Sequence, residues 1–127
     1  MNKCLRYLNL IELDAKSLME RAIKQKEEYI EIFASRRTRD HFDKVFHHRF
    51  FQLNYQELSY LEEETAIALF DFYNQVNRIS WYLLSTQDMP ATLEEKLHYK
   101  LGVLQELFEK LELFLSAQID VEKSKSD

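Results

Sequence analysis

The chain has 127 residues, of which 46% are hydrophobic and 31% charged, and its formal net charge is −5. These values predict a single soluble domain with one hydrophobic core and exclude a disordered chain. The lack of a long apolar run argues against a membrane span, and the net acidity argues against nucleic-acid binding through general phosphate contacts. The single cysteine, Cys4, cannot form an internal disulfide, so we expect a reducing, cytoplasmic location.

Glycine and proline are nearly absent, with one residue of each. Because β-hairpins and tight turns depend on these two residues, a chain with so few of them must be built from long helices. The sequence therefore predicts an all-α fold, a helical bundle of three long helices and one shorter helix that form a single domain. We expect residues 1–13 and 121–127 to be mobile segments outside the bundle.

The first helix is predicted from Asp14, a suitable N-cap, to about Ala34. Its apolar residues recur at the helical period of about 100° per residue and define one buried face. These residues are Ile11, Ala15, Leu18, Ala22, Tyr29 and Phe33.

A break is predicted near residues 35–40. Without it, Phe33 and Phe42 would point in opposite directions from one helix, because nine steps of about 100° separate them. We therefore predict a turn, after which a second and shorter helix begins near Thr38 and ends near Phe51. The alternative is one bent helix that passes from one packing surface to another.

The third helix is predicted from Ser59 to about Leu84, because Ser59 and Glu62 fit a capping box. Its apolar residues form two adjacent stripes that cover more than half of the circumference. One stripe is Ala66, Phe70, Tyr73, Asn77, Trp81 and Leu84, and the other is Leu69, Phe72, Val76, Ile79 and Leu83. A helix with so wide an apolar face is expected to lie centrally, with neighbours on two sides.

The fourth helix is predicted from Thr92, at a second capping box, to about Ile119. Its apolar residues alternate spacings of four and three and form a heptad seam: Leu97, Leu101, Leu104, Phe108, Leu111 and Leu115. This seam suits packing in a bundle, and it is also our candidate surface for a homodimer. Gly102 lies inside this helix, where it would allow the close approach of a neighbour.

The segment from Arg36 to Arg49 is the most unusual local feature, because it is rich in arginine and histidine. On one helix, four of its cationic residues would lie within about 60° of one another and opposite an aromatic side. With the aromatic residues that follow, they form a candidate partner-binding surface, the basic–aromatic surface: Arg37, His41, Lys44, His48, Phe50, Phe51 and Tyr55. The alternative is a solvated helix face whose aromatic side is buried.

Two short motifs at His41 favour enzyme activity instead. His41 and Lys44 have the His-x-x-Lys spacing and resemble histidine phosphotransfer domains, which implies a phosphoryl group on His41 that Lys44 helps to neutralise. Val45 stands where those domains normally have a small residue. Arg36 and His41 have the Arg-x4-His spacing and resemble HEPN ribonucleases, which implies RNA cleavage. A third alternative is nucleic-acid binding through Arg36, Arg37, Arg39 and Lys44.

Glu95 and His98 match the Glu-x-x-His element of di-iron bundles, but the chain has no second copy of that element. A glycine-rich phosphate loop or a Gly-x-Ser-x-Gly nucleophile motif cannot be built with one glycine. We therefore expect no catalytic residue, no cofactor and no metal. The sequence predicts a non-enzymatic module for protein–protein interaction, such as an adaptor, a small regulator or a chaperone.

Overall fold

The computed structural model describes residues 3–36, 38–48 and 55–126. Within these ranges every regular element is a helix and none is a strand: α1 (Lys3–Met19), the π-helix η1 (Glu20–Lys24), α2 (Lys26–Arg36), α3 (Asp40–Val45), α4 (Tyr55–Leu58), α5 (Glu63–Ser85) and α6 (Pro90–Ser126). The predicted all-α helical bundle is confirmed.

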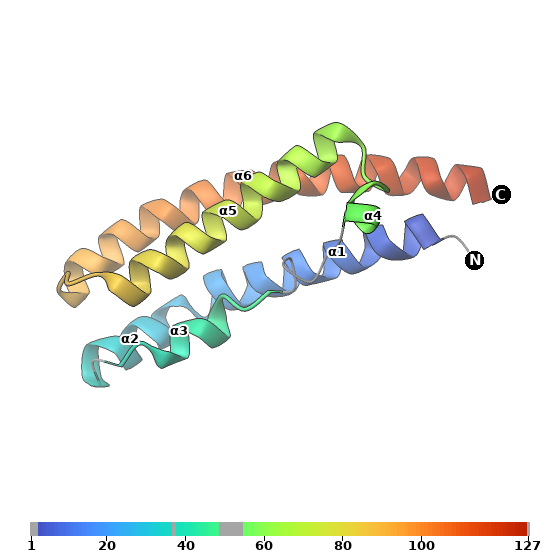
Figure 1. Ribbon diagram of the computed structural model, residues 1–127. Coiled ribbons are helices and arrows are strands. Elements are labelled where there is room, and N and C mark those ends of the chain that lie inside the picture. Colours follow the sequence, from blue (N-terminus) through green and yellow to red (C-terminus); the bar gives the residue numbers. More distant parts are fainter. Residues whose placement is uncertain (1–2, 37, 49–54, 127) are drawn as a thin grey trace.

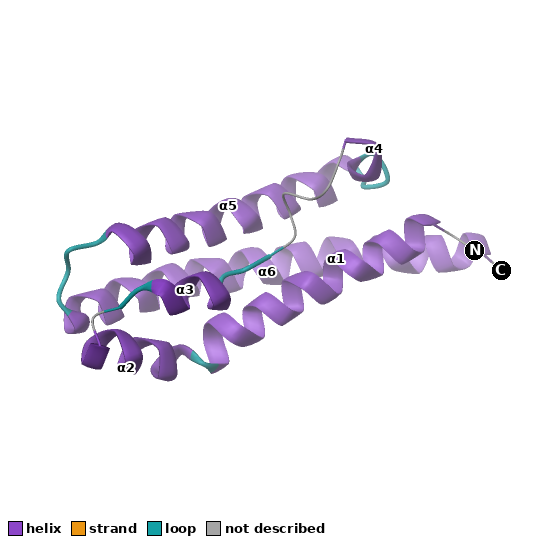
Figure 2. Ribbon diagram, turned by 60° about the horizontal axis from the view of Figure 1, so that its bottom comes forward, coloured by secondary structure: helices purple, strands orange, loops and turns teal. Residues whose placement is uncertain are grey.

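Three long helical units run side by side along the molecule (Figure 1). α5 and α6 form an antiparallel hairpin, and α1 also packs along α6. The segment that leads from α2 to α5 contains the short helices α3 and α4, and α3 packs against α5 (Figure 2). α5 thus has neighbours on two sides, as predicted, but α6 contacts α1, α2 and α5 and is the more central helix.

The heptad seam of α6 lies in the core of the chain. Its five leucines are at most 4% exposed. They face a fully buried stripe on α5, which consists of Leu69, Phe72, Val76, Ile79 and Leu83. Burial of each such side chain contributes about 1.5–3 kcal/mol to folding. A homodimer through this seam would have to open the bundle, so we no longer propose one there.

α1 begins at Lys3, well before the predicted start at Asp14. Tyr7 and Leu8 are buried and extend the inward face of the helix toward the N-terminus. The segment that we expected to be mobile is therefore helical and packed from residue 3 onward. Asp14 lies inside α1 and so caps no helix, and its carboxylate accepts a hydrogen bond of 2.5 Å from the hydroxyl of Tyr73.

Neither predicted capping box forms. α5 begins at Glu63, and the hydroxyl of Ser59 instead donates to the carbonyl of Gln56 at 2.5 Å. α6 begins at Pro90, whose fixed φ suits the first turn of a helix. It continues to Ser126, so most of the tail that we expected to be mobile is helical as well.

The predicted first helix is interrupted by η1. A π-helix has a wider turn than an α-helix, so it changes the direction in which the following residues point. Gln25 follows η1 with φ −99° and ψ 12°, and the chain then continues as α2. The hydroxyl of Tyr29 donates to the carbonyl of Ala22 at 2.7 Å and ties α2 back to η1. The apolar period did not reveal this break. The inward residues before and after η1 are all buried, so the apolar pattern looks continuous across it.

The turn predicted near residues 35–40 is confirmed, because α2 ends at Arg36 and α3 begins at Asp40. The predicted length of the second helix is wrong. α3 ends at Val45, since the chain then leaves the helical path and His48 forms a hydrogen bond with α5.

We predict that Gly102→Ala stabilises the protein. Gly102 is exposed inside α6, and a Cβ there would meet no neighbouring heavy atom within 4 Å, so the expected close approach does not occur. Alanine has the higher helix propensity and loses less chain entropy on folding, so the free energy of unfolding should rise by about 0.5–1 kcal/mol. Urea denaturation followed by circular dichroism measures this rise, and a lower stability would contradict the prediction.

Candidate functional site

The described residues of the basic–aromatic surface differ in their exposure. Three of its residues lie outside the described residues: Arg37, Phe50 and Phe51. Of the others, Lys44 is exposed and Tyr55 is 92% exposed, whereas His41 and His48 are half-buried. The predicted alignment needed one helix through position 48, and α3 ends before it. Each basic residue therefore has to be considered by its own contacts.

His41 is held inside the chain. Its Nε2 lies 2.8 Å from the carbonyl oxygen of Tyr29, and a carbonyl only accepts, so Nε2 carries the proton. Its Nδ1 is buried and has no hydrogen-bond partner, and its ring packs on Phe42 with centroids 4.2 Å apart. A phosphoryl acceptor or a catalytic base needs a nitrogen that a substrate can reach. These contacts therefore do not favour phosphotransfer or HEPN-like ribonuclease activity at His41.

Arg39 binds the C-terminal end of α5. Its Nη1 donates to the carbonyl of Leu84 at 2.9 Å, and its Nη2 donates to the carbonyl of Thr86. Its guanidinium also lies 5.8 Å from the centre of the Phe33 ring. The last carbonyls of a helix lack partners within the helix and carry partial negative charge, so a cation is stabilising there. These contacts give Arg39 a structural role at the end of α5.

Arg21 has the same role at the end of α3, and the sequence analysis missed it. Its Nε donates to the carbonyl of Val45 at 3.1 Å and its Nη2 to the carbonyl of His47, while Nη1 contacts the hydroxyl of Ser17 at 2.6 Å. Arg21 lies in η1, far from α3 in the chain. No local pattern signals this contact, because nothing near Arg21 indicates which carbonyls it will meet.

A polar cluster lies where the chain after α3 meets α1 and α5. Nε2 of His48 lies 3.2 Å from Oδ1 of Asn77, and its ring centroid lies 4.7 Å from that of Tyr73. The hydroxyl of Tyr73 in turn binds Asp14. Burial lowers the pKa of His48, while burial and the Asp14 carboxylate raise the pKa of Tyr73. The members of this cluster bind one another, which fastens three segments together.

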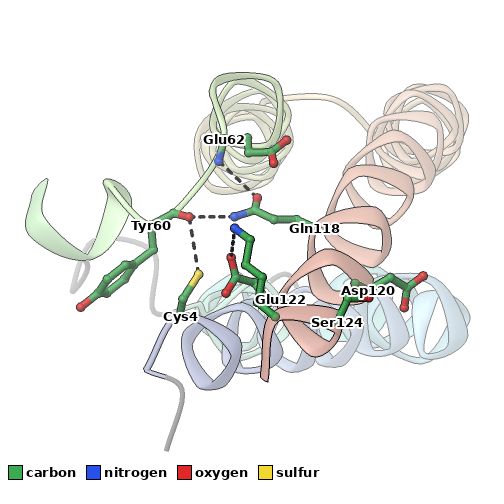
Figure 3. A network of polar contacts seen from close by, with 8 residues as sticks. Cys4, Tyr60, Glu62, Gln118, Asp120, Glu122 and Ser124 are labelled. Atoms are coloured by element: carbon green, nitrogen blue, oxygen red, sulfur yellow. Dashed lines mark hydrogen bonds and ion pairs between the residues drawn. The ribbon is translucent and has the colours of Figure 1, made fainter. Parts of the chain in front are cut away.

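A second polar network closes the end of the bundle that holds both ends of the described chain (Figure 3). Gln118 is 4% exposed; its Nε2 donates to the carbonyl of Tyr60 at 2.7 Å, and its Oε1 accepts from the backbone N–H of Glu62 at 3.2 Å. The thiol of Cys4 lies 3.7 Å from the same carbonyl. Burial and the nearby Glu122 raise the pKa of Cys4, so it remains a thiol at neutral pH. This network is structural.

Two shallow hollows lie along α6, and neither holds a recognisable catalytic set. The first, of about 310 Å³, is lined by Lys16, Met19, Glu20, Ile23, Lys24, Gln105, Phe108 and Glu112. The second, of about 400 Å³, is lined by Gln105, Phe108, Glu109, Glu112, Leu113 and Ser116. Lysines at the rim of the first are paired within their own helix segment, with Glu12 at 3.3 Å and Glu20 at 3.6 Å. Among the described residues, no group of His, Cys, Asp or Glu could hold a metal ion.

The outer side of α5 carries a row of exposed apolar residues, which we call the α5 row. Its members and their exposed fractions are Ile67 (52%), Phe70 (42%), Trp81 (73%) and Leu84 (37%). The helical period predicts that Phe70, Trp81 and Leu84 face inward together with Tyr73. Only Tyr73 of that set is buried, because the stripe lies at the edge of the packed face of α5. Two of its members, Phe70 and Trp81, are aromatic.

Comparison of the chain with protein families, with curated proteins and with solved structures gives no match. In the described part of the chain, no helix combines the length and apolar character needed to cross a bilayer. The function therefore has to be argued from the surfaces of this chain.

We predict that Arg39 and Arg36 differ sharply in their effect on stability. Arg39→Gln removes two bonds to helix carbonyls and should lower the free energy of unfolding by about 1–2 kcal/mol. Arg36→Gln changes an exposed residue at the end of α2 and should cost less than about 0.5 kcal/mol. Chemical denaturation of both variants measures the difference. Equal losses would mean that Arg39 does not hold the end of α5.

Stability should also fall in acid because of His48. Burial lowers the pKa of the folded-state imidazole below its ordinary value of 6.5, so the unfolded chain binds this proton more readily. The contribution of His48 is therefore present above pH 6.5 and is lost as the pH falls through the lowered pKa of the folded state. Urea denaturation at several pH values should show a smaller acid loss in His48→Gln than in the wild type. Identical pH profiles would show that His48 is not the group responsible.

Proposed function

We propose that this protein is a non-enzymatic protein-interaction module, and that it binds another protein through the α5 row. The observation that carries this proposal is the exposure of Trp81 and Phe70 on a helix that is packed along its opposite side. Exposed apolar rows of this kind are typical of interaction sites, and tryptophan is among the residues most enriched at binding hot spots.

The shape and chemistry of the α5 row suit a helical partner segment. From Ile67 to Leu84 the row extends over about 26 Å, since a helix rises about 1.5 Å per residue. Ile67 and Phe70 offer apolar contacts near one end of the row, and Trp81 and Leu84 offer them near the other. An amphipathic helix that lays its apolar side along such a row buries all of these residues at once.

Two residues on which the alternative functions depend have structural contacts within the chain. His41 and Arg39 are engaged in bonds to backbone carbonyls. Lys44 and Tyr55, the exposed members of the basic–aromatic surface, remain available as additional contacts for a partner. An adaptor, a small regulator or a chaperone in a reducing cytoplasm fits this set of features, and a lone Cys4 suits that compartment.

Capture of partner proteins from a lysate of the source cell tests this function. Trp81→Ser should lower the capture of a specific partner at least tenfold, which corresponds to about 1.4 kcal/mol. Tyr99→Ser is the matched control, because Tyr99 on α6 is 74% exposed and lies outside the α5 row. Circular dichroism verifies that both variants are folded, and quantitative mass spectrometry of the bound proteins gives the capture. Equal capture by both variants would mean that the α5 row is not the binding surface.

A further inference from the structure

The outer side of α5 carries a symmetric arrangement of aromatic rings and charges. Phe70 and Trp81 are eleven positions apart and Asp71 and Arg78 seven, so the members of each pair point within about 20° of each other. The midpoints of the two pairs fall within one residue of each other, near Gln75. All four side chains are exposed, and Phe70 keeps a contact within its own chain at 42% exposure.

This symmetry matches α5 to a copy of itself that runs in the opposite direction. Consider a two-fold axis that lies between the two copies, perpendicular to α5 and level with Gln75. It sets Phe70 of each copy beside Trp81 of the other. The same axis sets Asp71 of each copy beside Arg78 of the other. The two charged residues lie on the same flank of the two rings. Asp71 lies about 100° round the helix from Phe70, and Arg78 lies about 60° round the helix from Trp81 in the same direction. Charges therefore meet charges where rings meet rings, as a self-complementary two-fold interface requires.

Charge selects the antiparallel direction. Asp71 and Arg78 form no ion pair within the part of the chain that the structure describes. An antiparallel copy supplies each of them with an opposite charge. A parallel two-fold copy would set the charged flank of one helix beside the ring flank of the other, so neither Asp71 nor Arg78 would meet an opposite charge. The aromatic contacts supply the affinity, and the exposed ion pairs set the direction and register.

We propose that the partner of the α5 row is a second copy of this chain, in an antiparallel two-fold homodimer centred near Gln75. This inference rests on the proposed function, because it takes the α5 row to be a protein-binding surface and names the partner. It also moves the homodimer away from the leucine seam of α6, which is buried in the core.

Charge reversal tests the pairing directly. Arg78→Asp leaves two acidic residues on this flank of each copy, and Asp71→Arg leaves two basic residues, so each change should weaken dimerisation at least tenfold. The double variant should dimerise like the wild type, and a mixture of the two single variants should form heterodimers. Sedimentation equilibrium gives the masses. The salt concentration is about 0.15 M, because charges about 8 Å apart are only partly screened at that ionic strength. Tyr99→Ser is the control and should leave the dimer unchanged.

The outcomes separate this inference from the proposed function. A wild type that stays at the monomer mass of 15.4 kDa at every concentration overturns the homodimer. A dimer that tolerates both charge reversals overturns it as well. A monomeric wild type whose capture of another protein still depends on Trp81 overturns the homodimer and leaves the proposed function standing. A monomer without any Trp81-dependent capture overturns both.

Discussion

The long helices of this bundle are organised around the leucine seam of α6. α5 and α1 both pack on α6, and the seam leucines are at most 4% exposed. Because α5 turns one of its two apolar stripes toward this seam, that stripe is used entirely in the core. The other stripe reaches the edge of the packed face, where Trp81 and Phe70 remain exposed. The surface that we assign to binding is thus a consequence of how the core is packed.

The scarcity of glycine also accounts for the position of two arginines, Arg21 and Arg39, at the ends of helices. Helices commonly end at a glycine whose backbone conformation lets the chain satisfy the last carbonyls. The single glycine of this chain is Gly102, in the middle of α6, so α3 and α5 end without one. Arg21 and Arg39 donate to the carbonyls at those two ends instead. Within the segment from Arg36 to Arg49, Arg39 therefore serves helix termination, whereas Arg36 and Lys44 stay exposed.

α5 is held in place by side-chain hydrogen bonds at both of its ends and in its middle. Arg39 binds its C-terminal end, and Gln118 binds the backbone N–H of Glu62 just before its N-terminal end. Between the two ends, Tyr73 bonds to Asp14 and Asn77 to His48. A helix held at these points presents its outer side chains in fixed positions, which reduces the conformational entropy lost when a partner binds. In the proposed function, these interior polar groups would orient the α5 row toward a partner.

Local patterns in the sequence were sufficient to predict the all-α class, the turn before Asp40 and the apolar seam of α6. These features depend on residues that are close together in the chain, and periodicity reports them directly. The end of α3, the break at η1, the exposed edge of α5 and the roles of Arg21 and Arg39 depend on distant contacts. The two arginines bind carbonyls 24 to 47 positions away. The helical period specifies where a side chain points around its own helix, but the neighbour that it meets is set by how the helices pack.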